Sequence, residues 1–240
     1  MTEVQSTRAT TWRRLARWAA ITAIVEYVIV MVAAKSLIPP IVVILLVLLA
    51  AVVLMRRPPP AGRTVALVGL VLFLASDVIF GGNGFSTPRS FPSFAIALAG
   101  LITGVVGITA AVAARRDKMG RAAPLTMAWI AAGLILAVTA GNILASVTYA
   151  DATRQPGDVA LTARNTKFGP SQLTVNAGRV TFFINNKDLQ LHNFHIKGVG
   201  SAVLLPASHS VRRSFSLQPG TYTFVCDFHT PGMKGTLTVK

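Results

Sequence analysis

The chain has 240 residues, of which 52% are hydrophobic and 13% charged, and its mean hydropathy is +0.59. These values exclude a disordered chain and argue against a single ordinary soluble domain. The 23 Lys and Arg residues against 8 Asp and Glu leave a net charge of +15. On a soluble protein this charge would point to nucleic acid. Here long apolar runs explain it differently, because membrane proteins keep Lys and Arg in their cytoplasmic loops. We therefore expect no nucleic-acid partner.

Residues 1–148 contain five apolar segments long enough to cross a bilayer as helices. Each has 17 to 23 residues, close to the ~20 that such a helix needs. They predict a membrane region with spans near residues 15–34, 37–55, 64–80, 94–114 and 125–147. Glu26 and Asp77 fall inside predicted spans, where ionisable groups are functional-site hypotheses by default.

The loops between these spans predict the orientation of the chain. Eleven cations lie on one side, counted over the N-terminal segment and the second and fourth loops: Arg8, Arg13, Arg14, Arg17, Arg56, Arg57, Arg63, Arg115, Arg116, Lys118 and Arg121. The alternate loops hold only Lys35 and Arg89. The positive-inside rule puts the N-terminus in the cytoplasm, and five crossings put the C-terminal domain outside. Cleavage of the first span as a signal peptide is an alternative that leaves the final topology unchanged.

The composition changes abruptly after the fifth predicted span. Residues 149–158 are polar, contain Pro156-Gly157 and predict a linker. From residue 159 to 240 the apolar runs shorten to strand length: Val180, Phe182 and Ile184 alternate with polar positions, and turn signals such as Pro219-Gly220 separate the runs. Six to eight short strands in this length predict a small all-β sandwich.

The segment Cys226-Asp-Phe-His229-Thr-Pro-Gly-Met233 places a thiolate, an imidazole and a thioether within eight residues. A second imidazole is available upstream at His192. Two imidazoles, one thiolate and a weak axial thioether are the ligand set of a blue-copper electron-transfer centre. Zinc rarely recruits methionine and prefers a closed site with more cysteine or histidine.

Three segments of the C-terminal domain resemble cupredoxins of the plastocyanin, pseudoazurin and amicyanin kind. They are Asn185–Phe194 (NNKDLQLHNF), Pro219–Cys226 (PGTYTFVC) and His229–Val239 (HTPGMKGTLTV). The resemblance implies a Greek-key sandwich that holds one copper ion, cycling between Cu(I) and Cu(II), on His192, Cys226, His229 and Met233. It also implies that Asn193 ties the two ligand loops together. The three residues between His229 and Met233 fall between the loop lengths of known members.

The remaining candidate ligands have ordinary structural interpretations. Strand alternation sends His195 to the face opposite His192, so we expect it to be structural or exposed. His209 lies in the polar stretch Pro206-Ala-Ser-His-Ser and is expected to be solvated. A lone cysteine is often a small buried hydrophobe, but an unpaired extracytoplasmic thiol is an oxidation liability unless a metal protects it.

The sequence thus predicts a membrane-tethered blue-copper protein that transfers single electrons on the outer face of the cytoplasmic membrane. The alternative is extracytoplasmic copper acquisition or delivery with the same ligands. We expect no enzyme, because four protein ligands leave little room for substrate and the chain lacks further histidine pairs. The expected partners are the lipid bilayer and a redox or copper-handling protein.

Overall fold

The computed structural model describes residues 3–34, 36–56, 60–116 and 122–240. Four of the cations that predict the orientation lie outside the described residues: Lys35, Arg57, Lys118 and Arg121. The chain divides into two compact units. One comprises Met1–Phe85 and Ala95–Gly141, and the other comprises Ser86–Phe94 and Asn142–Lys240.

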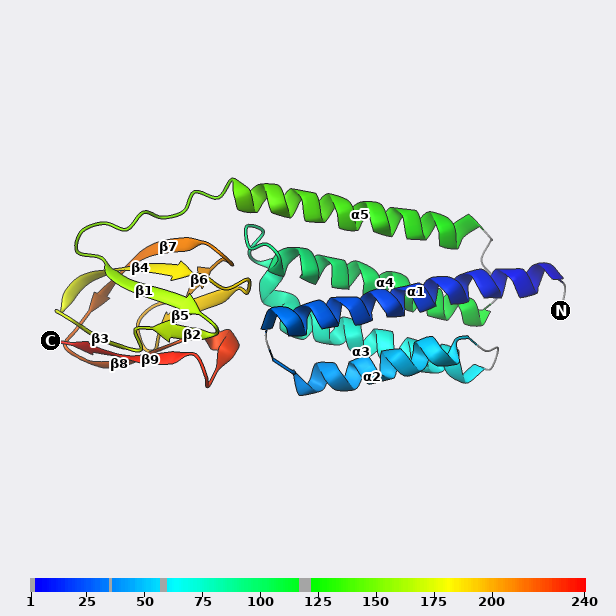
Figure 1. The fold of residues 1–240 in the computed structure, drawn as a ribbon, viewed down its shortest axis with the longest axis horizontal. Helices are drawn as coiled ribbons and strands as arrows, with labels where there is room; N and C mark the ends of the chain where they lie inside the picture. Colours follow the sequence, from blue (N-terminus) through cyan, green and yellow to red (C-terminus); the bar gives the residue numbers. More distant parts are fainter. Residues whose placement is uncertain (1–2, 35, 57–59, 117–121) are drawn as a thin grey trace. The chain divides into compact units, whose positions relative to one another are not determined.

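The five predicted apolar segments are all helical, and Figure 1 shows them as the blue-to-green part of the chain. The helices are α1 (Glu3–Ala34), α2 (Pro39–Leu54), α3 (Pro60–Phe85), α4 (Ser93–Arg116) and α5 (Ala122–Val147). Among the described residues, four of them are long and apolar enough to cross a membrane, whereas α2 has only 16 residues. Pro39 and Pro40 stand in the first turn of α2, where a missing N–H costs a helix little.

Small residues let the helices of the first unit approach closely. A Cβ atom added at Gly107 would lie 2.8 Å from a methyl carbon of Leu70, and one at Gly104 would lie 2.9 Å from Leu74. Such contacts are typical of helix packing in membranes. Within this unit the carboxylate of Glu26 accepts a hydrogen bond from Thr103 (3.0 Å), which gives the ionisable group a polar partner on another helix.

The C-terminal part of the chain is a sandwich of two sheets, as predicted (Figure 1). One sheet has the order β2-β1-β4-β7 and the other β3-β9-β8-β5-β6. The strands are β1 (Val159–Arg164), β2 (Lys167–Gly169), β3 (Gln172–Val175), β4 (Gly178–Asn186), β5 (His192–Ile196), β6 (Val203–Leu205), β7 (Ser210–Leu217), β8 (Gly220–Val225) and β9 (Lys234–Val239). Strands β1 and β4 pair in parallel, as do β3 and β9, whereas the other pairs are antiparallel.

Alternating apolar residues from both sheets form the core of the sandwich. Phe182 and Ile184 of β4 are completely buried, as the alternation in the sequence predicts. Phe194 and Phe224 pack against them from the second sheet, with ring centroids 5.5 Å apart. Gly235 lies where β9 crosses this core: an added Cβ would overlap the Phe224 ring and lie 2.5 Å from the carbonyl oxygen of Ser171. The packing therefore requires glycine at this position.

Candidate metal centre

Two segments at one end of the sandwich carry the predicted ligands. His192 is the first residue of β5, and Cys226 follows directly after β8. A single 3-10 turn, η1 (Asp227–His229), brings His229 back beside Cys226, because the N–H of His229 donates to the Cys226 carbonyl (3.1 Å). The N–H of Met233 then donates to the His229 carbonyl (3.0 Å), and the N–H of Cys226 donates to the Met233 carbonyl (2.9 Å). Backbone bonds thus close residues 226–233 into a tight loop.

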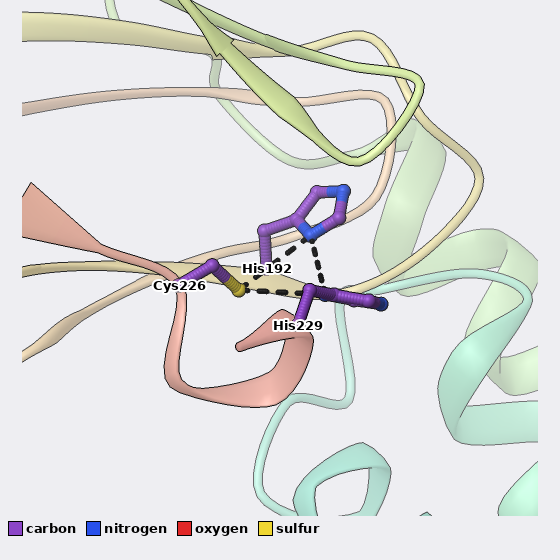
Figure 2. A group of neighbouring side chains, drawn as sticks. All are labelled: His192, Cys226 and His229. Atoms are coloured by element: carbon purple, nitrogen blue, oxygen red, sulfur yellow. Dashed lines mark hydrogen bonds between the residues drawn. The ribbon is translucent and has the colours of Figure 1, made fainter. Parts of the chain in front are cut away.

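The side chains of His192, Cys226 and His229 converge on one point (Figure 2). The two Nδ1 atoms lie 3.1 Å apart, and the Cys226 sulfur lies 3.7 Å from the Nδ1 of His192 and 3.4 Å from that of His229. Cys226 and His192 are completely buried, whereas His229 is half-buried. The structure thus brings together three of the four predicted ligands as a compact donor set.

Met233, the fourth predicted ligand, is completely buried in the same core cluster as Cys226. Its position immediately before β9 follows from the closed loop, because both its N–H and its carbonyl are bonded within residues 226–233. Burial beside the cysteine is compatible with a thioether ligand.

Hydrogen bonds on the far side of each imidazole fix which nitrogen faces the cluster. The Nε2–H of His192 donates to the carboxylate of Asp188 (2.9 Å), and the Nε2–H of His229 donates to the amide oxygen of Gln190 (2.9 Å). Neutral imidazole carries one proton, so both Nδ1 atoms present lone pairs. Two lone pairs 3.1 Å apart, with a cysteine sulfur beside them, repel each other, and this donor set favours binding of a cation. Such outer partners are a regular feature of metal-bound histidines.

The donor spacing fits a first-row metal ion. Bonds of roughly 2.0 Å to nitrogen and 2.3 Å to sulfur, about 120° apart, place the donors ~3.5–3.7 Å from one another. The observed separations lie between 3.1 and 3.7 Å. One soft sulfur and two imidazole nitrogens in a buried site suit copper better than an oxygen-seeking cation such as magnesium.

The protein environment keeps the two imidazoles neutral. Burial and, as a smaller cause, the neighbouring His192 together lower the pKa of His229 to about 4. Burial also lowers the pKa of His192, although the Asp188 carboxylate opposes the shift. Burial raises the pKa of the Cys226 thiol, so a bound cation is needed to hold the thiolate form near neutral pH.

Asn193 joins the two ligand segments, which confirms the role that the resemblance implied. Its side-chain oxygen accepts the N–H of Asp227 (2.8 Å), and its side-chain NH₂ donates to the Asp227 carboxylate (2.9 Å). Its backbone N–H donates to the Cys226 sulfur (3.4 Å). These three bonds restrain both the position and the electron density of the cysteine sulfur.

The other two histidines lie outside the donor group. His195 is partly exposed and contacts Asp227 through its Nδ1 (2.9 Å), as expected for the opposite face of the strand. The expectation for His209 was wrong, because it is buried rather than solvated. Its ring contacts Ser146 (3.0 Å) and Asp151 (3.3 Å) and lies 4.6 Å from the ring of Tyr149. Polar side chains near the linker therefore supply its partners, which its local sequence does not indicate.

Asp188 and Gln190 are site residues that the sequence analysis did not single out. Both lie in the segment that carries the resemblance, four and two residues before His192. The sequence could have indicated them, because a histidine ligand almost always donates its other N–H to an acceptor, and both side chains offer an acceptor oxygen close to His192 in the chain.

A two-sheet sandwich with a His–Cys–His donor group between its strand ends is the arrangement of a cupredoxin-like copper domain. Residues 130–239 match the family model described as "Cupredoxin-like domain", so this part of the chain is a cupredoxin-like domain. A reduced Cu(I) form of an amicyanin variant aligns at 26% identity, covering 38% of this chain and 90% of that chain, with a TM-score of 0.33. An oxidised amicyanin variant aligns at 25% identity over the same shares, with a TM-score of 0.32. The domain and its donor group support one copper ion per chain.

Proposed function

We propose that this protein is a membrane-tethered blue-copper carrier of single electrons, with His192, Cys226, His229 and Met233 as its copper ligands. The observation that carries the proposal is the convergence of one sulfur and two unprotonated nitrogens within 3.7 Å of one another. Copper supplies the one-electron Cu(I)/Cu(II) couple. A rigid, mostly buried donor set favours this use, because a site that changes little between oxidation states costs little reorganisation.

Each side chain of the site has a distinct role in the proposal. Cys226 supplies the thiolate, and the N–H donated by Asn193 restrains its charge. His192 and His229 supply the two nitrogens, held in the required tautomers by Asp188 and Gln190. Met233 supplies a weak fourth contact that tunes the potential.

The His229 edge is the proposed place where electrons enter and leave. His229 is half-buried, and Thr230, Pro231 and Gly232 beside it are exposed. Leu189 is 58% exposed although it is apolar, and it precedes Gln190, which contacts the outer nitrogen of His229. An exposed apolar residue next to the least buried ligand suits brief docking of a redox partner.

The membrane placement follows from the apolar helices and the charge of their loops. We propose five crossings, with the N-terminus in the cytoplasm and the copper domain on the outer face. Reporter fusions to the loop after α3 and to the C-terminus test this orientation. Alkaline phosphatase should be active at both sites. Green fluorescent protein should be dark at both sites, because it does not fold when it is exported unfolded. Active phosphatase at the loop after α2 would contradict the orientation.

The functional test uses the full-length protein in detergent, loaded with Cu(II) and cycled between reductant and oxidant. We expect one copper per chain that survives repeated cycles while the absorption bleaches and recovers. Loss of the metal to a Cu(I) chelator in each reduced phase would contradict the electron carrier and favour copper delivery. Turnover of an added substrate such as nitrite or dioxygen would contradict the expectation that the protein is no enzyme.

A further inference from the structure

The loop between α3 and α4 belongs to the same compact unit as the copper domain. This unit contains Ser86–Phe94 together with Asn142–Lys240. The loop is ordered by its own backbone bonds, since the N–H of Ser90 donates to the Thr87 carbonyl (2.9 Å) and the N–H of Phe94 donates to the Ser90 carbonyl (3.0 Å). Ser90 is completely buried and Thr87 nearly so, although both come from a short loop between apolar helices.

Ser93 contacts the segment that carries the first histidine ligand. Its hydroxyl accepts the backbone N–H of Leu191 at 3.2 Å. Leu191 is 7% exposed and immediately precedes His192. A restraint on this amide therefore acts one residue away from the imidazole that faces Cys226.

Ser90 contacts the turn that follows β6, the strand that pairs with β5 at His192. Its hydroxyl accepts the N–H of Ala207 at 2.9 Å, and Ala207 is completely buried. Ala207 lies two residues after Leu205, the residue that pairs with His192 across β5 and β6. The side-chain NH₂ of Asn186 joins the two segments, because it donates to the carbonyls of Gln190 (2.8 Å) and Leu205 (3.0 Å).

Other contacts hold the loop in the unit. The side-chain NH₂ of Asn142 donates to the Pro88 carbonyl at 2.7 Å, and Asn142 is 2% exposed. The Arg89 guanidinium lies 5.6 Å from the centre of the Tyr149 ring, which in turn packs against His209. The loop thus has partners in other segments of the unit from Pro88 to Ser93.

We infer that the Ser86–Phe94 loop, which joins α3 and α4, is a positioning element of the copper centre, in which Ser93 and Ser90 restrain the backbone of the two paired segments just before His192 and just after Leu205. The inference rests on the copper centre proposed above. The backbone N–H groups of Leu191 and Ala207 donate to Ser93 and Ser90, so the loop supplies hydrogen-bond acceptors next to the first histidine ligand. The loop between α3 and α4 then tunes the redox site.

The test compares full-length Ser93→Ala, Ser90→Ala and Ser93→Thr variants with the unaltered protein in detergent. Threonine keeps the acceptor hydroxyl and is expected to rescue. Ser214→Ala is the matched control, because it removes a hydroxyl that bonds Thr181 (2.8 Å) on the sandwich surface. The readouts are the midpoint potential, the copper paramagnetic resonance spectrum, and amide hydrogen exchange at Leu191 and Ala207 without copper.

We expect Ser93→Ala to speed exchange at Leu191 roughly 2- to 10-fold, the effect of losing one ordinary hydrogen bond. The potential and the resonance spectrum should shift in both alanine variants and return in Ser93→Thr, while Ser214→Ala matches the unaltered protein. Exchange and potential unchanged in both alanine variants would overturn the inference. If the unaltered protein gives no blue-copper spectrum, the proposed function fails, and the exchange rates still decide whether the loop restrains the segment.

Discussion

Replacing Asp188 with asparagine removes the negative charge that faces the first histidine ligand while keeping the shape of the side chain. The two carboxylate oxygens accept three N–H groups: one from Asn165 (2.7 Å), one from Thr166 (3.0 Å) and one from His192 (2.9 Å). Burial alone would raise the pKa of Asp188, but these donors lower it overall, so the carboxylate is charged at neutral pH. Asn165 and Thr166 have φ angles of 52° and 55°, a strained turn that the carboxylate helps to hold.

An asparagine can accept at only one of the two oxygen positions, so at least one N–H donor loses its partner. The cost to apo-protein stability is about 0.5–1.5 kcal/mol, the net value of one hydrogen bond, because Asn165, the only donor to its oxygen, is exposed to water. Loss of a charged partner of a histidine ligand should weaken copper binding about 10- to 100-fold. The potential should rise, because loss of the negative charge disfavours the oxidised, more highly charged ion relative to the reduced one.

Denaturant unfolding of the apo protein and copper titration against a competing chelator measure these effects. Asp158→Asn is the control: this carboxylate pairs with Arg212 (2.8 Å) away from the ligands, so its loss should leave copper affinity unchanged. Copper affinity and potential in Asp188→Asn equal to those of the unaltered protein would refute the reasoning that Asp188 orients His192.

Gly235→Ala should destabilise the copper domain by about 1–3 kcal/mol, because the added Cβ overlaps the core. Gly169→Ala is the control, because an added Cβ there meets nothing within 4 Å. Equal unfolding midpoints for the two variants would contradict this prediction. Burial lowers the pKa of His229 to about 4 and also lowers that of His192. Below pH ~6.5, the ordinary pKa of histidine, the unfolded apo protein therefore binds more protons than the folded apo protein. Apo stability should therefore fall as pH drops from about 6.5 towards 4, and a flat profile would contradict neutral buried imidazoles. Met233→Leu should retain copper and raise the potential, and an unchanged potential would mean that Met233 is not a ligand.

The sequence was sufficient for the features that depend on local spacing. The apolar segments predict the five helices because a membrane-spanning helix must bury or shield every residue of a long run. The alternation at Phe182 and Ile184 predicts the buried face of β4. The spacing of Cys226 and His229 predicts the loop that brings their donor atoms to 3.4 Å. In each case neighbours along the chain set the geometry.

The features that the sequence did not predict depend on distant partners. His209 lies in a polar stretch, and it is buried because Ser146, Tyr149 and Asp151 surround it. Ser93 contacts Leu191 across 98 positions of the chain, and a serine between two apolar helices carries no mark of such a contact. Serine is common in loops for its local bonding, so only the fold distinguishes a positioning serine from an ordinary one.

The most direct test of the copper centre is the spectrum of the full-length protein and its Cys226→Ser variant, each loaded with Cu(II) in detergent. We expect an intense visible band from thiolate-to-copper charge transfer and narrow copper hyperfine splitting in the unaltered protein. Both should disappear in Cys226→Ser, because the hydroxyl cannot replace the thiolate. A Cys226→Ser variant with the same band, or an unaltered protein without it, would contradict the central claim that Cys226, His192 and His229 hold copper together.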